Sequence, residues 1–554
     1  MKLNRRQTLL GMTTAMILPA GCATQGATSE SFANAVFAHG VASGDPDADS
    51  VVLWTRISGA TRATDVAWRV ALDPDMDEVV ASGTARTGAD RDYTVKVVPT
   101  GLASGRRHYY QFEAMGTASP IGRTMTLPEG QLDQLVIGVA SCSNYPFGHF
   151  NGYEAIADDA DIEIVIHLGD YIYEYDENSY GAEPGRRLGR VHEPRHEIVT
   201  LADYRTRHAQ YKSDPGSLAM HAMHPLIHTW DDHESTNNPW MGGAQNHQAE
   251  EGDWTERRAR SLRAYYEWMP ARDPLPGQAP EQRWAHYRFG DLASVFTMES
   301  RHTARSEQID LGANRDTLTD PEAAADFYSS VVGAEDRRML SARQEDFLAT
   351  GIAESVESGQ PWRILANQTI LAKVIAPNID EPDMNDLLAT QPAESSSLLE
   401  ALTAVGKLGI PANMDAWDGY PAARNRLYGL ARKAGARDLL VITGDTHIFW
   451  QNRLFAEDGA AMGVELGTTA ITSPRGFYQL GESATNRYDE LVADANDSVV
   501  WANGRFRGYI RLTLTRERAR ADFIAVSTID STDYSVRTLR SATIRRQNGT
   551  LVYG

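Results

Sequence analysis

The chain has 554 residues, of which 42% are hydrophobic and 23% are charged, an ordinary composition for a soluble globular protein. This length is too great for one compact core and fits a large domain with a smaller one beside it. The formal net charge of −21 at pH 7 argues against nucleic acid as a dedicated partner and against an anionic membrane surface, because both are negatively charged themselves.

Residues 1–30 are predicted to be an export signal. Arg5 and Arg6 precede an apolar stretch, from Leu9 to Pro19, that is too short to span a bilayer as a stable helix. Twin arginines in this position resemble the signal read by the twin-arginine export machinery, and an ordinary secretory signal is the alternative. Residues 17–22 look like a lipoprotein signal ending at Cys22. The sequence thus leaves open a soluble periplasmic or secreted protein and one attached to the membrane through lipidated Cys22.

Residues 31–130 are predicted to form a small all-β domain, a fibronectin- or immunoglobulin-like sandwich. Short β-rich runs recur at intervals suited to such a sandwich, namely Val51–Trp54, Val66–Val70, Tyr93–Val98 and Tyr109–Phe112. Gly and Asp punctuate these runs, and Pro128-Glu129-Gly130 is the expected boundary.

Residues 131–554 are predicted to form an α/β domain in which two sheets are faced by helices. Helices are expected at Glu256–Trp268, Ser341–Ile352 and Ala422–Lys433, and a closing hairpin at Arg507–Thr515 and Ala519–Val526. Pro421 and Gly435 bracket the third helix, which is the expected asymmetry of helix ends.

Polar clusters directly follow five apolar runs of this domain. The runs are Leu135–Val139, Ile162–Ile166, Leu226–Trp230, Ile364–Leu365 and Leu439–Ile442, and the side chains that follow them include Cys142, Asp170, Asp232, Asn367 and Asp445. Because strand ends converge at one edge of an α/β sheet, these residues can share one site. Such a mixture of donor types is difficult to explain as packing.

Each cluster has a structural and a functional interpretation. Cys142 is the one cysteine besides Cys22, and a buried structural thiol is the common default. Tyr173 could be packing, although a phenolate is a hard ligand suited to ferric iron. We expect His447, two residues after Asp445, to share its side of an extended segment. Carboxylate and amide oxygens suit calcium, whereas thiol, phenol and imidazole suit a transition metal.

The Asp231-Asp232-His233-Glu234 segment is predicted to combine metal binding with catalysis. Adjacent carboxylates raise each other's pKa unless a cation neutralises them. We expect Asp232 to bind metal, His233 to donate a proton or contact phosphate, and Asn237 to bind phosphate or a cation. Arg190 is our choice among several nearby arginines for a phosphate contact through its bidentate fork, with Arg187 and Arg205 as alternatives.

The string His192-Glu193-Pro194-Arg195-His196 matches the zinc-peptidase pattern H-E-x-x-H. That pattern needs a continuous helix to align both histidines, and Pro194 would break it. A zinc peptidase is therefore not predicted.

The chain resembles the PhoD-type alkaline phosphatases, a branch of the metallophosphoesterases. The resemblance extends over nearly all of the predicted exported chain and rests on several motifs in the right order: 39–46, 53–56, 169–175, 230–234, 418–421 and 444–447. It implies a four-layer α/β/β/α catalytic fold with Fe3+ and Ca2+ in the site. Cys142, Asp170, Tyr173 and His447 would bind iron, and Asp170 would bridge to calcium together with Asp232, Asp445 and an asparagine, Asn367. The chain departs from the family at residues 298–302, where an aspartate-threonine-arginine run is more usual.

The predicted function is hydrolysis of small phosphate esters, with release of inorganic phosphate from monoesters and cleavage of diesters as well. A phosphodiesterase, including a phospholipase D-like enzyme, is the alternative among enzymes. An exported phosphate- or metal-binding protein without turnover is the alternative of another class.

Overall fold

The computed structural model describes residues 32–380, 382–388, 396–474 and 481–554. The predicted export signal and Cys22 lie outside the described residues. Within those ranges, no helix is both long enough and apolar enough to cross a membrane.

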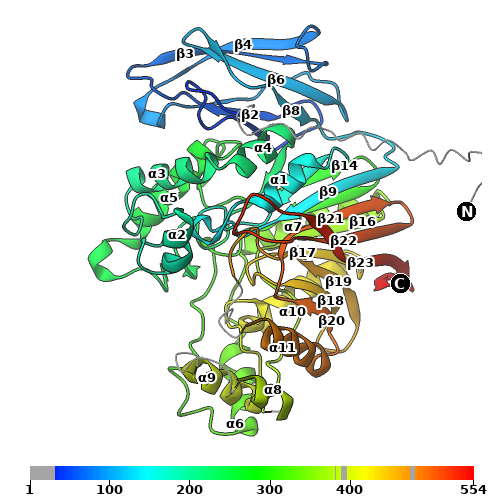
Figure 1. The fold of residues 1–554 in the computed structure, drawn as a ribbon. Coiled ribbons are helices and arrows are strands. Elements are labelled where there is room, and N and C mark those ends of the chain that lie inside the picture. The colour runs from blue at the N-terminus through cyan, green and yellow to red at the C-terminus, as the bar shows by residue number, and fades with distance from the viewer. Residues whose placement is uncertain (1–31, 381, 389–395, 475–480) are drawn as a thin grey trace, which may run out of the picture.

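Two large β-sheets form the centre of the molecule (Figure 1). The first has ten strands: β1 (Val41–Gly44), β2 (Val52–Arg56), β5 (Thr94–Val97), β9 (Gln134–Ala140), β10 (Ile164–His167), β11 (Leu226–His228), β21 (Arg507–Thr515), β22 (Arg518–Val526), β23 (Val536–Gln547) and β24 (Thr550–Tyr553). The second has seven: β14 (Ala285–Phe289), β15 (Ala293–Thr297), β16 (Trp362–Ala366), β17 (Leu439–Thr443), β18 (Phe449–Phe455), β19 (Ala461–Gly467) and β20 (Val499–Asn503).

The strand order places parallel strands at the centre of both sheets. The orders are β24-β23-β22-β21-β9-β10-β11-β1-β2-β5 and β14-β15-β16-β17-β19-β18-β20. Strands β9, β10 and β11 run parallel to one another, as do β15, β16 and β17. All of these strands are near-continuous apolar runs because both of their faces are buried.

Alternate side chains of each strand enter different cores. Ile166 of β10 and Ile364 of β16 belong to the core between the two sheets. Val165 faces the other way, into a core formed with helices α1, α3, α4 and α5, and Leu365 faces a core formed with α7, α10 and α11. The period-2 alternation of a strand thus determines which residue joins which core.

The helices agree with the mixed α/β class predicted from the sequence. They are α1 (Asn151–Asp158), α2 (Ala182–Leu188), α3 (Leu201–Lys212), α4 (Pro215–Met223), α5 (Trp254–Trp268), α6 (Pro321–Phe327), α7 (Ala342–Glu357), α8 (Pro382–Leu388), α9 (Ser396–Leu408), α10 (Pro421–Lys433) and α11 (Gly481–Ala495). Helices α5, α7 and α10 were each expected within a few residues. Pro421 begins α10, and Gly435, with φ 82°, follows its end.

The N-terminal strands belong to two sheets, one of which is the ten-stranded sheet of the α/β region. Strands β3 (Thr64–Ala71), β4 (Val79–Thr87), β6 (Arg107–Ala114), β7 (Thr117–Ala118) and β8 (Gly122–Met125) form a separate five-stranded sheet. In contrast, β1 pairs with β11 in parallel, opposite Leu226. A Cβ at Gly44 would lie 2.5 Å from the carbonyl oxygen of Pro270, so this close approach requires glycine. The ten-stranded sheet therefore includes three strands of the segment predicted as a separate sandwich.

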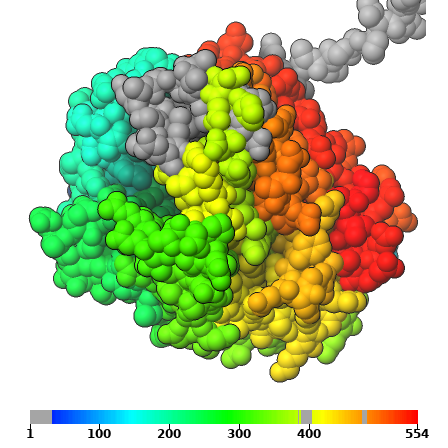
Figure 2. Space-filling model, turned by 90° about the horizontal axis from the view of Figure 1, so that it is seen from below, coloured from blue at the N-terminus to red at the C-terminus, as the bar shows by residue number. Residues whose placement is uncertain are grey.

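Helices α6, α8 and α9 lie together below the sheets in Figure 1. Helix α6 contacts α9, and α8 contacts α11. Seen from below, the green and yellow segments of the chain lie beside the orange segments near α11 (Figure 2). The chain segments on either side of α8 and α9, residues 370–377 and 412–416, contribute to the cavity described next.

Candidate metal centre

The predicted polar clusters lie where parallel strands of both sheets end. Cys142 follows β9, Asp170 follows β10 and Asp232 follows β11. Asp445 and His447 follow β17 in the other sheet. Because the two sheets pack face to face, these strand ends share one edge of the molecule.

Tight backbone turns position these side chains. Backbone φ values between 57° and 63° occur at Cys142, Asp170, Asp445 and His447. This left-handed region is unfavourable for residues with a side chain, and such residues cluster at functional sites. Gly169, with φ 102°, permits a close approach to Asp231, whose backbone nitrogen would lie 2.3 Å from a Cβ added at Gly169.

A thiol, a carboxylate and an imidazole form the first donor group. The Sγ of Cys142, a carboxylate oxygen of Asp170 and a ring nitrogen of His447 all lie within 4.8 Å of one another. The hydroxyl of Tyr173 donates to Asp170 Oδ2 at 3.0 Å and lies 3.2 Å from His447 Nε2. His447 Nδ1 lies 2.5 Å from the carbonyl oxygen of Pro474, and donation there leaves the Nε2 lone pair facing the group. Burial lowers the pKa of His447 to about 3, which keeps the imidazole neutral, as a ligand must be.

The second donor group consists of carboxylates. One oxygen from each of Asp231, Asp232 and Asp445 lies within 4.8 Å of the others. Oδ2 of Asp231 and Oδ1 of Asp232 are buried without a hydrogen-bond partner. Buried polar atoms without partners are costly, and a hard cation is the group that would satisfy these oxygens. Asp170, Asp232 and His233 form a further group that links the two sets.

The acidic side chains of this site are crowded together and raise one another's pKa. Burial and then the charge of Asp232 raise the pKa of Asp170 well above its usual value. Burial and the charge of Asp231 do the same for Asp445. Burial, followed by the charge of Asp170, raises the pKa of the Cys142 thiol. Bound cations would reverse these shifts, because positive charge favours the deprotonated form of each group. The residues present therefore fit metal ions.

Arg301 is a buried cation that sequence reasoning missed. Its guanidinium lies 2.5 Å from Asp231, 2.7 Å from Asp415 and 3.1 Å from Asp445. Arg305 also binds Asp415, at 2.5 Å. The signal was available, because Arg301 follows the parallel strand β15 as the metal-site residues follow theirs. Arg301 therefore holds Asp231 and Asp445, which follow a strand of each sheet, together with Asp415.

His233 is held by a buried carboxylate. Its Nδ1 lies 2.7 Å from Glu174 Oε2, and its Nε2 lies 3.7 Å from Asp232 Oδ2. Glu174 also accepts hydrogen bonds from the backbone N–H of Asn237 at 2.8 Å and from the Asn246 amide at 2.9 Å. Although burial opposes it, the carboxylates of Asp232 and Glu174 raise the pKa of His233 well above its usual value. Glu174 thus fixes which imidazole nitrogen faces the site.

Two of the predicted site residues have partners outside the donor groups. Arg190 pairs with Asp214 at 2.7 Å and donates to the carbonyl of Tyr145, because the turn after α2 directs it away from the donor groups. The Asn367 side-chain oxygen accepts a hydrogen bond from the indole of Trp417 at 3.3 Å. Neither residue lines the site cavity. The ion pair with Asp214 occupies the Arg190 guanidinium, so its assignment to phosphate is not retained, whereas the assignment of Asn367 to a cation stays a prediction.

A cavity of about 600 Å³ opens beside the donor groups. Asp170, Asp232, His233 and Asp445 line one part of it together with Asn237. This volume is typical of sites that hold a whole small molecule rather than one isolated phosphate group.

The H-E-x-x-H string is not part of this centre. Residues 192–196 do not form a helix. His192 Nε2 lies 3.0 Å from the Tyr211 hydroxyl, whereas His196 is exposed and lies 3.2 Å from Asp203. The two imidazoles thus have separate partners, in agreement with the rejection of a zinc peptidase.

Comparison with known proteins gives one consistent family. The family model described as "PhoD-like phosphatase" matches residues 137–523, and "PhoD-like phosphatase, N-terminal domain" matches residues 21–128. Alkaline phosphatase D of Bacillus subtilis (strain 168) is 33% identical over 512 residues, which is 89% of this chain and 78% of that protein. A solved structure described as "Structure of PhoD" is similar with a TM-score of 0.76 and 30% identity, covering 94% of this chain and 92% of that one.

Proposed function

Because the chain belongs to the PhoD-like phosphatase family and is an alkaline phosphatase D-like hydrolase, we propose that it releases inorganic phosphate from phosphomonoesters in a metal-dependent reaction. The observation that supports metal dependence is the pair of unpartnered carboxylate oxygens of Asp231 and Asp232, which belong to a donor group whose other member, Asp445, lines the cavity together with Asp232. An acidic site attracts phosphate only when cations set the local sign of the charge. The alternative of a binding protein without turnover is not retained, because the family is one of hydrolases.

We assign two unlike cations to the two donor groups. The thiol, phenol and imidazole of Cys142, Tyr173 and His447 suit Fe3+, with Asp170 as a further ligand. The carboxylates of Asp232 and of the neighbouring acidic residues suit Ca2+. Asp170 belongs to a donor group with each set, which supports a bridging role for this carboxylate. When bound, the cations would polarise the phosphate oxygens and activate the attacking oxygen.

The side chains around the cations have separable roles. In the hydrolysis, an oxygen atom from water forms a bond to phosphorus, the ester P–O bond breaks and the departing alkoxide takes up a proton. His233 would hold that proton on Nε2, the nitrogen opposite its bond to Glu174. Asn237 lines the same cavity and would donate to a phosphate oxygen through its amide.

Phosphodiesters, including phospholipid-type diesters, are the second candidate substrates. The cavity of about 600 Å³ extends beyond the donor groups, which leaves room for a second ester substituent. The same cations can catalyse both reactions, so the shape of the cavity determines the preference.

The proposed location is outside the cytoplasm. The basis is the arrangement of Arg5, Arg6 and the short apolar stretch after them, which supports export by the twin-arginine machinery. The sequence around Cys22 supports lipid attachment as one of the two forms to be tested, the soluble form being the other.

The test is an ester-hydrolysis panel on protein isolated after native export. Rates on an aryl phosphomonoester and a matched aryl phosphodiester would be compared at alkaline pH with calcium, before and after chelation. We expect chelator-sensitive hydrolysis with a preference for the monoester. A preference for the diester would instead support phosphodiesters as the main substrates. Activity that resists exhaustive metal removal would refute metal dependence.

Two variants connect the metals to their ligands. Asp170→Asn should lose bound metal and activity together, because this carboxylate belongs to a donor group with each set. Exposed Asp65, which pairs with Arg86 on the N-terminal sheet, provides the matched control Asp65→Asn. Tyr173→Phe should abolish any visible absorption from tyrosinate bound to iron. An active, metal-replete Asp170→Asn protein would contradict the assignment.

A further inference from the structure

The catalytic cavity has two chemically different ends. The carboxylates and His233 form the metal end, and the lining also includes an apolar wall formed by Val374, Ile375, Trp450 and Val492. The two ends are directly connected, because the indole N–H of Trp450 donates at 2.9 Å to the hydroxyl of Thr446, the residue between Asp445 and His447. A group bound to phosphorus at the metal end would therefore share the cavity with this wall.

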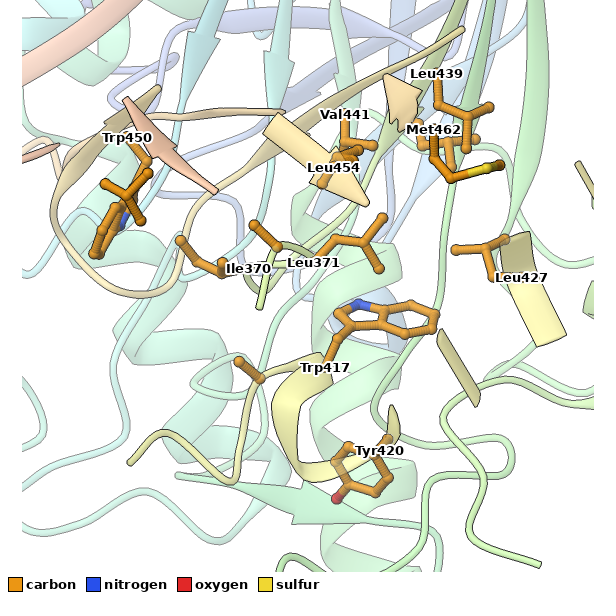
Figure 3. Packing of buried hydrophobic residues seen from close by; sticks show 14 of the residues in the cluster. Ile370, Leu371, Trp417, Tyr420, Leu427, Leu439, Val441, Trp450, Leu454 and Met462 are labelled. Atoms are coloured by element: carbon orange, nitrogen blue, oxygen red, sulfur yellow. The ribbon is translucent and has the colours of Figure 1, made fainter. Parts of the chain in front are cut away.

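The apolar wall is a rigid part of the fold. Trp450 and Val492 are 6% and 3% exposed and belong to the core on the outer face of the seven-stranded sheet. Figure 3 shows Trp450 at one edge of this core, with Ile370 between it and Leu371. Val374 is half-buried, and its backbone N–H donates to Asp418 at 2.8 Å. The wall thus exists before any ligand binds, which reduces the entropic cost of binding against it.

The described residues that line the cavity include no lysine or arginine. Arg301 lies behind the acidic cluster, fully buried, and is not among the lining residues. Metal cations at one end would neutralise one phosphate group, but among the lining residues no cation faces a second anionic group. An ester whose alcohol part carries a further phosphate or carboxylate would leave that charge unpaired against an apolar surface.

We propose that this wall is a binding site for the alcohol part of the substrate and that the enzyme prefers phosphate esters of uncharged alkyl or aryl alcohols. This inference rests on the proposed function, since it assumes that phosphate binds at the metal end. Val374 and Ile375 contribute the half-buried apolar surface of the wall, and Trp450 contributes a flat ring next to the metal-site turn. Transfer of apolar groups from water to this wall determines specificity.

The experiment is a series of butyl, hexyl and octyl phosphate, assayed below their critical micelle concentrations, with glycerol phosphate as the polar reference. Release of inorganic phosphate gives kcat/KM for each ester. We expect kcat/KM to rise by roughly two- to fourfold per CH2 group until the wall is covered, as expected for transfer of a methylene group from water. A kcat/KM that does not change along the series would overturn the inference while leaving the phosphatase function intact.

Variants locate the effect on the wall. Val374→Asp places a carboxylate there and should lower the ratio of octyl to glycerol phosphate kcat/KM by about tenfold or more. Val374→Thr, which keeps the shape of the side chain, should lower the ratio by a smaller factor. It keeps the test informative if Val374→Asp fails to fold. Val80→Asp, at a position 48% exposed on β4, is the matched control and should leave both rates unchanged. An unchanged ratio in both Val374 variants would refute the site. Failure of the wild type to hydrolyse any ester of the series would refute the inference and the proposed function together.

Discussion

Replacing the buried Arg301 by glutamine should destabilise the protein strongly when metals have been removed. The guanidinium is fully buried and contacts Asp231, Asp415 and Asp445. Removal of one partner of a buried ion pair costs about 3–5 kcal/mol, because an uncompensated charge stays in the interior. Asp415 keeps its contact with Arg305, so the loss falls mainly on the other two carboxylates. We therefore expect a decrease of about 3–5 kcal/mol in the free energy of unfolding, and not a multiple of that value.

The assay is urea unfolding of the chelated protein at neutral pH, followed by circular dichroism. The matched control is Arg86→Gln, because Arg86 forms a pair of 2.8 Å with Asp65 but both side chains are more than 60% exposed. Such a surface pair contributes little. Calcium should reduce the difference in the free energy of unfolding between Arg301→Gln and wild type, since a bound cation replaces part of the lost positive charge. A loss in Arg301→Gln no larger than in the control would refute this account of the cluster.

Three other changes test the framework of the site. Gly169→Ala should reduce the free energy of unfolding by roughly 2–4 kcal/mol in urea titrations, because its φ of 102° is strained for alanine and the new Cβ would lie 2.3 Å from the Asp231 nitrogen; an unchanged midpoint would contradict this. Glu174→Gln should lower kcat with metal content unchanged, because this carboxylate orients the site histidine at 2.7 Å; loss of metal instead would show a ligand role. Burial alone would raise the pKa of Asp45, but the charge of Arg283 lowers it to about 2. Because the pKa of Asp45 is lower in the folded protein than its usual 3.8, the ionised carboxylate adds about 2 kcal/mol to the free energy of unfolding above pH 3.8. This contribution is lost as the pH falls toward 2. The free energies of unfolding of wild type and Asp45→Asn, measured by urea titration, should therefore converge over this pH range.

The rule that strand ends converge located most of the candidate site from sequence. It grouped Cys142, Asp170, Asp232 and Asp445, because parallel strands are readable as apolar runs and their carboxyl ends share an edge. The same rule applies to Arg301 after β15, but residues 298–302, which include Arg301, were treated only as a departure from the family. Asp415 follows no strand, so nothing in the local sequence marks it as a partner of this cluster.

Other features depend on orientation and long-range pairing, which residue types do not encode. Arg190 is a suitable phosphate ligand by type, but the turn after α2 directs it to Asp214. The pairing of β1 with β11 joins residues about 180 positions apart through a contact that requires a missing side chain at Gly44. The sequence analysis predicted the run that contains β11 but no strand at Val41–Gly44, and periodicity contains no information on which sheet β1 extends.

The charge arrangement of the site explains why one cation is built into the fold and others are bound. On the interior side, Arg301 neutralises carboxylates of both sheets, so the strand ends can meet during folding without metal. In contrast, Oδ2 of Asp231 and Oδ1 of Asp232 have no hydrogen-bond partner, and the guanidinium of Arg301 lies no closer than 3.7 Å to Asp232. A second fixed arginine there would satisfy them but would also occupy the space in which phosphate must bind. An exchangeable cation satisfies the same oxygens and keeps open coordination positions for the substrate. A buried guanidinium beside carboxylate oxygens without hydrogen-bond partners is therefore the arrangement expected of a site that must both fold and bind phosphate.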